Sequence, residues 1–292
     1  MPLRFSGTGV AIITPFHEDN SIDFASLEKL TEHLIKGKVD FIVALGTTGE
    51  AVTLSFPEKM LFVARLKRII NHRVKLVVGL GGNNTDEVLN QIRQSDFEGI
   101  SGILSVTPYY NKPQQRGMIE HFTKIADKCP VPVILYNVPS RTSVNLTAES
   151  ILQLAEHRNI VAVKEASACL NQITEIIRHK PSGFSVLSGD DAITLPLLAL
   201  GADGVISVIA NAFPFEFSEM VRSALKNDIQ NARLLHHKLI EIIHTLFEDG
   251  NPAGIKSLLE LMQLSTNNLR LPLVKANADV QQKLQQLIHK FN

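Results

Sequence analysis

The stretch that decides the fold is Val161-Ala162-Val163-Lys164-Glu165-Ala166, a short apolar run with one lysine near its end. Its β-branched residues predict a strand buried on both faces, and such strands are typical of parallel sheets in α/β proteins. Because side chains alternate along a strand, we expect Lys164 to share a face with Ala162, while Val161 and Val163 point the other way.

The lysine allows two interpretations. In the first, its stem lies against the sheet and its ammonium reaches solvent from the strand end. In the second, Lys164 is buried beside the small side chain of Ala162. A buried ammonium either finds a partner or loses its proton, and a neutral amine is a nucleophile toward carbonyl groups. The second interpretation predicts imine chemistry.

Apolar runs alternate with longer amphipathic segments along most of the chain, which indicates repeated βαβ units. The expected strands are Gly9–Thr14, Phe41–Leu45, Lys75–Gly79, Gly102–Val106, Val131–Tyr136, Ile160–Glu165, Ser185–Ser188 and Gly204–Val208. Helix start patterns lie between them, for example Ser55-Phe56-Pro57-Glu58. Eight strand–helix units predict an α/β fold, a (β/α)8 TIM barrel, because a doubly wound sheet normally stops at about five to seven strands.

Only helices are expected after the eighth strand. Asp249-Gly250-Asn251-Pro252 interrupts the helical pattern, and two further helices are predicted at about Ala253–Met262 and Ala278–Lys290. A barrel needs one closing helix. We therefore expect residues 1–225 to form a catalytic barrel and residues 226–292 to form a C-terminal helical extension that covers a barrel end or contacts another subunit.

Composition excludes several classes of protein. The 292 residues include 29 basic and 29 acidic side chains, so no excess charge favours nucleic acid or an anionic membrane. The start, Met1–Gly7, lacks the pattern of a signal peptide, and the apolar region from Ile193 to Phe215 carries too many polar and turn residues for a membrane span. These features predict a cytoplasmic protein.

Cysteine and histidine usage predicts neither a disulfide framework nor a metal site. Cys129 and Cys169 are the two cysteines, a number that fits a reducing compartment, and we expect Cys169 to be a small buried thiol. His236 and His237 are adjacent and so face different sides of a helix. We expect no metal and no cofactor.

Polar residues gather after the expected strands, where active sites of this barrel class lie. Gly46-Thr47-Thr48-Gly49-Glu50 after the second strand offers hydroxyl and backbone N–H groups to a carboxylate, although an ordinary Ser/Thr turn has the same composition. The loops Thr107–Pro113 and Tyr136–Thr142 hold all three tyrosines of the chain, and Ser188–Asp191 ends the seventh strand. A carboxylate cradle, a phenol, a guanidinium and a lysine at one barrel mouth predict imine chemistry on a keto acid.

The segments Gly46–Glu50, Pro108–Pro113, Tyr136–Thr142, Lys164 and Gly204–Ser207 resemble the motifs of the dihydrodipicolinate synthase family. This family belongs to the pyruvate-dependent class I aldolases, which include N-acetylneuraminate lyase, and the resemblance runs from Gly7 to Pro272. It implies condensation of pyruvate with L-aspartate-4-semialdehyde in the diaminopimelate route to lysine. It also implies a homo-oligomer, namely a tetramer of two tight dimers.

The resemblance assigns roles to individual residues. Lys164 forms the Schiff base, and Tyr136 relays protons with Thr47 and with Tyr110, which reaches in from the neighbouring subunit. The other expected contacts hold the two substrates: Thr47 and Thr48 bind the pyruvate carboxylate, the Gly189 and Ile206 backbones complete that pocket, and Arg141 binds the carboxylate of the semialdehyde.

The resemblance also implies a cleft that binds lysine as an inhibitor, at positions Ala51, Val52, Phe56, Lys59, Asn83, Glu87 and Tyr109. Glu87, Asn83 and Tyr109 suit a lysine ligand. Phe56 offers no hydrogen bond, and Lys59 places a positive charge near the ammonium of the ligand. We therefore expect weak inhibition by lysine, or none.

Three alternatives remain open from the sequence. A sibling aldolase that uses pyruvate with a sugar aldehyde shares the barrel, the lysine and a similar loop after the second strand. A pyridoxal-phosphate barrel also uses a lysine imine and would absorb near the visible range. A non-catalytic barrel would form no adduct with carbonyl compounds.

Overall fold

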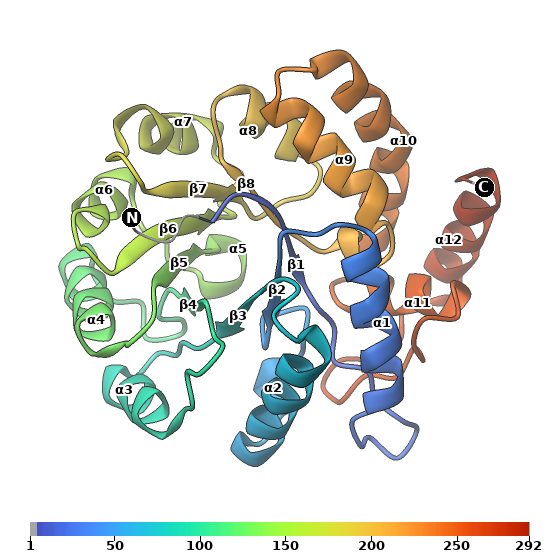
Figure 1. Ribbon diagram of the computed structural model, residues 1–292, viewed down its shortest axis with the longest axis horizontal. Helices are drawn as coiled ribbons and strands as arrows, with labels where there is room; N and C mark the ends of the chain where they lie inside the picture. The colour runs from blue at the N-terminus through green and yellow to red at the C-terminus, as the bar shows by residue number, and fades with distance from the viewer. Residues whose placement is uncertain (1–4, 292) are drawn as a thin grey trace.

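The computed structural model describes residues 5–291, within which eight parallel strands close into one barrel (Figure 1). The strands are β1 (Gly7–Ala11), β2 (Phe41–Ala44), β3 (Lys75–Gly79), β4 (Gly102–Val106), β5 (Val133–Asn137), β6 (Ile160–Glu165), β7 (Ser185–Ser188) and β8 (Gly204–Ser207). Each pairs with its neighbour in sequence, and β8 pairs with β1 to close the barrel. The predicted (β/α)8 fold is confirmed.

Helices surround the barrel (Figure 1). They are α1 (Phe24–Lys36), α2 (Phe56–Ile70), α3 (Thr85–Gln94), α4 (Gln115–Lys128), α5 (Pro139–Thr142), α6 (Ala148–Ala155), α7 (Leu170–His179), α8 (Thr194–Ala199), α9 (Pro214–Leu225), α10 (Ile229–Phe247), α11 (Ala253–Leu261) and α12 (Ala278–Phe291), with the 3-10 turns η1 (Ala51–Thr53) and η2 (Ile209–Asn211). Helix α2 begins after Ser55, as expected. The Ser55 hydroxyl accepts the Glu58 N–H, and the Glu58 carboxylate accepts the Ser55 N–H at 2.8 Å.

Two apolar clusters hold the barrel together. The larger cluster lies between the outward faces of the strands and the helices, and it includes Val163 and Phe122. The smaller cluster fills the barrel interior with residues such as Val43, Leu104 and Leu187. Side chains of alternating strand residues therefore reach either the helices or the interior, and a polar residue near an interior strand end lies at the mouth.

The observed strand boundaries differ most from the sequence prediction at β1 and β5, while β2 and β8 each end one residue earlier than expected. β1 was expected at Gly9–Thr14 and instead spans Gly7–Ala11, because Gly7 and Gly204 have no side chains and their backbones pair closely. β5 was expected to begin at Val131 and begins at Val133. The preceding residue is Pro132, which lacks the N–H that a ladder position donates.

A β-bulge in β6 corrects the predicted direction of Val161. Ile160 pairs with Val133, whereas the next residue of β5, Ile134, pairs with Ala162, so Val161 is an extra residue in the ladder. Val161 packs with the interior cluster instead of sharing the outward face of Val163. Beyond the bulge the predicted alternation is correct.

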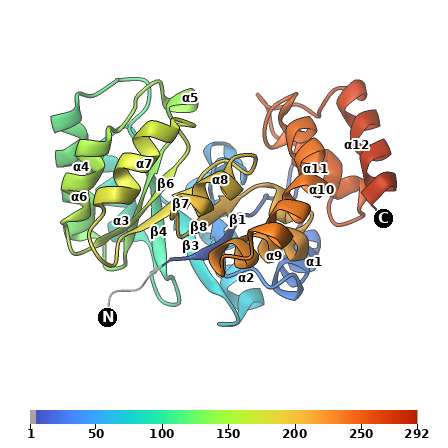
Figure 2. The ribbon, with the colours of Figure 1, turned by 90° about the horizontal axis from the view of Figure 1, so that it is seen from above.

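The last three helices gather at one side of the barrel (Figure 2). α10 packs against α9, and α12 packs against both α10 and α11. The predicted break at residues 249–252 separates α10 from α11, as expected. Among the described residues, none of the helices has the length and apolar character needed to cross a membrane.

Candidate active site

Lys164 is buried near the end of β6, with 5% of its surface exposed. Its Nζ lies 4.5 Å from the ring centroid of Tyr136. The two residues are register partners on adjacent strands, so both side chains point into the barrel. The alternative in which Lys164 extends from the strand end into solvent is therefore wrong.

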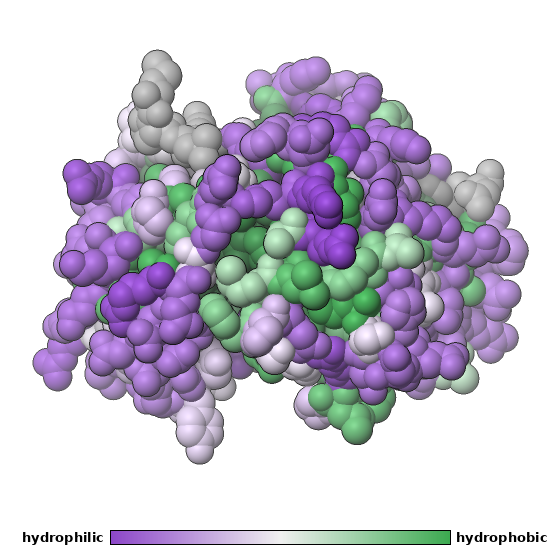
Figure 3. Space-filling model, turned by 60° about the horizontal axis from the view of Figure 1, so that its bottom comes forward, coloured by the Kyte–Doolittle hydropathy of each residue, from purple (hydrophilic) through white to green (hydrophobic). Residues whose placement is uncertain are grey.

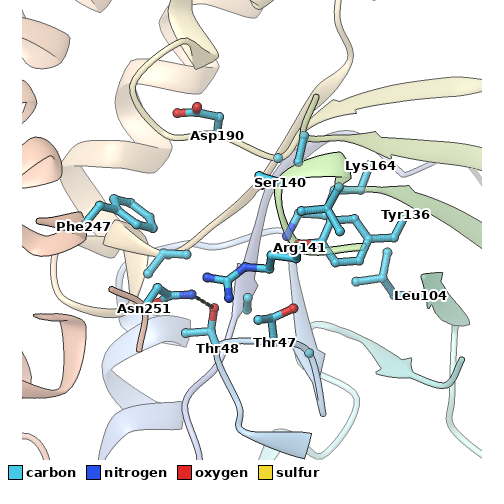
Figure 4. Close-up of a pocket in the computed structure, with 16 residues that line it drawn as sticks. Thr47, Thr48, Leu104, Tyr136, Ser140, Arg141, Lys164, Asp190, Phe247 and Asn251 are labelled. Carbon is cyan, nitrogen blue, oxygen red and sulfur yellow. Dashed lines mark hydrogen bonds between the residues drawn. The ribbon is translucent and has the colours of Figure 1, made fainter. Parts of the chain in front are cut away.

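A cavity of about 210 Å³ opens beside this pair at the barrel mouth. The predicted site residues that line it come from five separate segments: Thr47, Thr48, Tyr136, Arg141, Lys164 and Gly189. Figure 4 shows the Arg141 side chain extending into this cavity from α5. The structure thus brings together the predicted cradle, phenol, guanidinium and amine.

The loop after β2, which the sequence predicts to hold a carboxylate, turns tightly. The N–H groups of Gly49 and Glu50 donate to the Gly46 and Thr47 carbonyls, and the Thr14 hydroxyl donates to the Gly49 carbonyl at 2.6 Å. Over the part of the chain that the structure describes, no hydrogen bond engages the N–H groups of Thr47 and Thr48. These groups are available to an anionic ligand.

A buried ion pair fastens this loop to the C-terminal extension. The Glu50 carboxylate pairs with Lys256 of α11, and both side chains have 0% exposure. The Arg270 N–H donates to Glu50 at 3.1 Å, and the Lys256 Nζ also donates to the Asn268 carbonyl at 2.7 Å. Burial lowers the pKa of Lys256 to about 8, while the Glu50 charge opposes that shift.

The sequence analysis did not predict that the C-terminal helical region lines this cavity. Phe247 ends α10, and Asn251 lies in the break before α11 (Figure 4). The Asn251 side-chain amide donates to the Thr48 hydroxyl at 3.0 Å. The sequence does show that residues 249–252 interrupt the helical pattern. No local sequence feature, however, indicates that this interruption lies at the barrel mouth.

Two predicted site residues lie outside the cavity. Ile206 is buried in the interior cluster and does not line the cavity. Tyr110 is 90% exposed on the loop after β4. Within this single chain, the structure does not bring Tyr110 to Tyr136.

Gly189 is placed by close contact with the end of β6. Its N–H donates to the Glu165 carbonyl at 2.8 Å, which leaves its own carbonyl as the group that can face a ligand. An added Cβ at Gly189 would lie 2.5 Å from the Ala166 Cβ, so only glycine allows this approach.

The expected lysine cleft is divided between two cavities. Ala51, Val52 and Tyr109 line a largely apolar cavity of about 370 Å³, which also borders Tyr136. Phe56 and Lys59 line a separate, smaller cavity of about 50 Å³. The remaining two expected residues make other contacts: Asn83 donates to the Tyr109 carbonyl at 3.1 Å, and Glu87 accepts from Gln91 at 3.4 Å.

The prediction for Cys169 is wrong. This thiol is exposed, because the residue precedes α7 on a surface turn after β6. Cys129 is buried, and burial raises its pKa to about 11.

A (β/α)8 barrel with a buried lysine and a tyrosine at its mouth defines a lyase of the class I aldolase type. The family model for the "Dihydrodipicolinate synthetase family" matches residues 4–291. A 4-hydroxy-tetrahydrodipicolinate synthase from Parabacteroides distasonis is 47% identical, over 99% of this chain and 98% of that protein. The chain belongs to the dihydrodipicolinate synthetase family, and its activity is the 4-hydroxy-tetrahydrodipicolinate synthase reaction of lysine biosynthesis.

Solved structures agree with this assignment. Dihydrodipicolinate synthase from Aquifex aeolicus has a TM-score of 0.95 and 40% identity, covering 99% of this chain and 98% of that one. The chloride-inhibited enzyme from Acinetobacter baumannii, solved in complex with pyruvate, has a TM-score of 0.95 and 38% identity, with 98% of each chain covered.

Proposed function

We propose that Lys164 forms the imine with pyruvate and that the loop after β2 holds the pyruvate carboxylate. The observation that carries this proposal is the buried Lys164 Nζ, 4.5 Å from the Tyr136 ring centroid, in a cavity lined by Thr47 and Thr48. The related enzyme from Acinetobacter baumannii, which was solved with pyruvate bound, supports the choice of keto acid.

The proposed reaction begins with attack of the neutral Lys164 amine on the pyruvate ketone, which releases water and leaves an imine. Loss of a methyl proton through Tyr136 and Thr47 converts the imine into an enamine. The enamine carbon attacks the aldehyde of L-aspartate-4-semialdehyde, whose carboxylate binds Arg141. The amino group of that substrate then displaces Lys164 and closes the ring.

Mass spectrometry after borohydride reduction in the presence of pyruvate tests this proposal. Reduction of the imine adds one pyruvyl-derived group, and peptide mapping places it on Lys164. The Lys164→Ala variant serves as the matched control, because it keeps the barrel but has no amine. A folded, pyruvate-saturated wild-type protein without the adduct contradicts the imine assignment. Faster turnover of N-acetylneuraminate or keto-deoxygluconate than of the semialdehyde supports a sibling aldolase.

We also propose that two copies of the chain form a tight dimer in which Tyr110 enters the partner's site, and that two such dimers form a tetramer. Tyr110 is 90% exposed, and Val52, which is 85% exposed, lines the apolar cavity that borders Tyr136. Figure 3 shows apolar residues gathered in a hollow on one face of the molecule. Cover by a second copy removes this apolar surface from water.

A further inference from the structure

The two residues that directly follow the proposed catalytic pair form a second pair behind it. Asn137 follows Tyr136 in β5, Glu165 follows Lys164 in β6, and Asn137 and Glu165 are register partners. Strand alternation directs them away from the cavity toward the helices. Their exposures are 0% and 1%, so both polar side chains are fully enclosed.

The side chains of this second pair are hydrogen-bonded to each other. Asn137 Nδ2 lies 3.2 Å and 3.1 Å from the two carboxylate oxygens of Glu165. The Asn137 Oδ1 accepts the Leu146 N–H at 2.9 Å, which fixes the orientation of the amide. The Glu165 carboxylate also accepts the Ser167 N–H at 2.8 Å and the Gln172 side-chain N–H at 3.1 Å.

The contacts of Glu165 suit an acceptor-only group. Its hydrogen-bond partners Asn137, Ser167 and Gln172 all donate through N–H groups, and an ionised carboxylate accepts such donors through both oxygens. Burial raises the pKa of Glu165, whereas these donors favour its charged form. Burial of a carboxyl group costs free energy of folding, so we expect this one to have a function.

The network reaches the supports of four proposed site residues. Asn137 and Glu165 lie on the strands that carry Tyr136 and Lys164. In addition, the Glu165 carbonyl accepts the Gly189 N–H at 2.8 Å. Leu146 lies four residues beyond α5, the helix that carries Arg141. Asn137 also donates to the Asn145 side chain at 2.9 Å, next to Leu146. One hydrogen-bonded cluster, fully buried at Asn137 and Glu165, therefore joins the backbone segments that present the amine, the phenol and the guanidinium.

We propose that Glu165 and Asn137 are positioning residues that set the geometry between Lys164 and Tyr136. This inference rests on the proposed roles of Lys164 and Tyr136. The hydrogen bonds fix the last rung of the β5–β6 ladder, one residue beyond the reacting pair. A displacement of about 1 Å in such a pair costs about 10²-fold in rate, so a rigid rung behind it has a direct effect on turnover.

The test is a double-mutant cycle between Glu165→Gln and Tyr136→Phe. Glu165→Gln turns an amide NH2 toward N–H donors, which breaks the network while keeping the size of the side chain. We expect kcat to fall about 10- to 100-fold with the KM for pyruvate changed by less than about threefold. In the Tyr136→Phe background, the same substitution lowers kcat by less than about threefold, because the geometry that it controls no longer matters. Glu120→Gln, at an exposed glutamate on α4, is the matched control and keeps wild-type kcat.

A second variant covers the case in which Glu165→Gln does not fold. Gln172→Leu removes one donor to Glu165 from the half-buried edge of the network and should lower kcat severalfold, with the folded fraction checked by circular dichroism. Wild-type kcat in the folded variants overturns the proposal. It is also overturned if the fold-loss of kcat in the double variant equals the product of the fold-losses in the Glu165→Gln and Tyr136→Phe single variants. These results leave the imine assignment intact if wild-type Lys164 is labelled by pyruvate and borohydride, whereas an unlabelled wild-type Lys164 overturns the proposed function itself.

Discussion

The side-chain amide of Asn251 donates a hydrogen bond of 3.0 Å to the hydroxyl of Thr48, which lies 203 residues earlier in the chain. Thr48 belongs to the proposed pyruvate cradle, and Asn251 belongs to the C-terminal extension. The helices beyond the barrel therefore complete one wall of the site, together with Phe247. Changes in the extension should affect catalysis as well as stability.

The buried ion pair between Glu50 and Lys256 gives the first prediction. Lys256→Met leaves the Glu50 carboxylate enclosed without a cation, which should lower the free energy of unfolding by about 3–5 kcal/mol and raise the KM for pyruvate by loosening the cradle. Adding Glu50→Gln to Lys256→Met should restore part of the stability. Urea unfolding and pyruvate kinetics measure both effects. Lys283→Met, at an exposed pair with Glu248, is the control and should change stability little. A similar small loss in Lys256→Met would show that the buried pair does not hold the loop.

Arg141 gives a prediction about substrate choice. Its side chain enters the cavity from α5, and a guanidinium binds a carboxylate through two parallel hydrogen bonds. Arg141→Ala should weaken kcat/KM for the semialdehyde by about 2–4 kcal/mol, while pyruvate and borohydride still label Lys164. Arg141→Lys keeps the charge but loses the fork and should fall in between. Equal loss for both substrates would contradict the assignment.

Subunit mixing tests the location of Tyr110. Tyr110 is exposed in the single chain, and we expect it to act in the partner's site. Tyr110→Phe and Lys164→Ala homodimers should each be nearly inactive, whereas mixed dimers should recover part of the activity because one of their sites has both residues. Differently tagged subunits allow the mixed species to be purified. No recovery in purified mixed dimers would place Tyr110 in its own subunit's site.

The expectation of weak inhibition by lysine stays a prediction. Lys59 is half-buried beside Phe56, and burial lowers the pKa of Lys59. A cation there repels the ammonium of a lysine ligand, and the aromatic ring of Phe56 offers it no hydrogen bond. We expect half-inhibition above about 1 mM, which corresponds to binding weaker than about 4 kcal/mol. Lys59→Met should lower that concentration. Half-inhibition of the wild type below about 1 mM would show that the cleft works.

His121 predicts a loss of stability in acid. This α4 residue is 5% exposed, its Nδ1 lies 2.9 Å from the Thr85 hydroxyl, and burial lowers its pKa from 6.5 to about 4. The unfolded chain binds the proton first, so the contribution of neutral His121 is complete above pH 6.5 and is lost as the pH falls toward 4. The loss is roughly 2 kcal/mol at pH 5. Urea unfolding measures the free energy of unfolding at pH 7.5 and at pH 5. The difference between these two values should be smaller in His121→Gln than in the wild type by about 2 kcal/mol. If this difference is the same in the variant and the wild type, groups other than His121 cause the acid sensitivity.

The sequence was sufficient for the parts of the site that follow strand ends. In a closed parallel barrel the carboxyl ends of all strands meet at one mouth, so Thr47, Tyr136 and Lys164 could be brought together on paper from strand order alone. Phe247 and Asn251 could not, because their position depends on how α10 and α11 fold back over the barrel. That arrangement is set by long-range packing and by the Glu50–Lys256 pair, and no local pattern encodes it.

Short helices and bulges could not be predicted from hydrophobic periodicity either. The four residues of α5 carry Arg141, yet such a short helix has no periodicity to detect. Likewise, hydrophobic alternation in β6 gave the right face for Lys164 but the wrong one for Val161, because a bulge adds a residue without changing composition.

The bulge at Val161 means that β6 contains one residue more than its ladder with β5 requires. Loss of any one residue between Ile160 and Lys164 would leave a regular strand in which Lys164 still pairs with Tyr136. β5 has no such spare position between Ile134 and Tyr136, so a deletion there would turn Tyr136 toward the helices. The two strands of the reacting pair therefore differ in their tolerance of deletions, and the strand that carries the lysine is the more tolerant one.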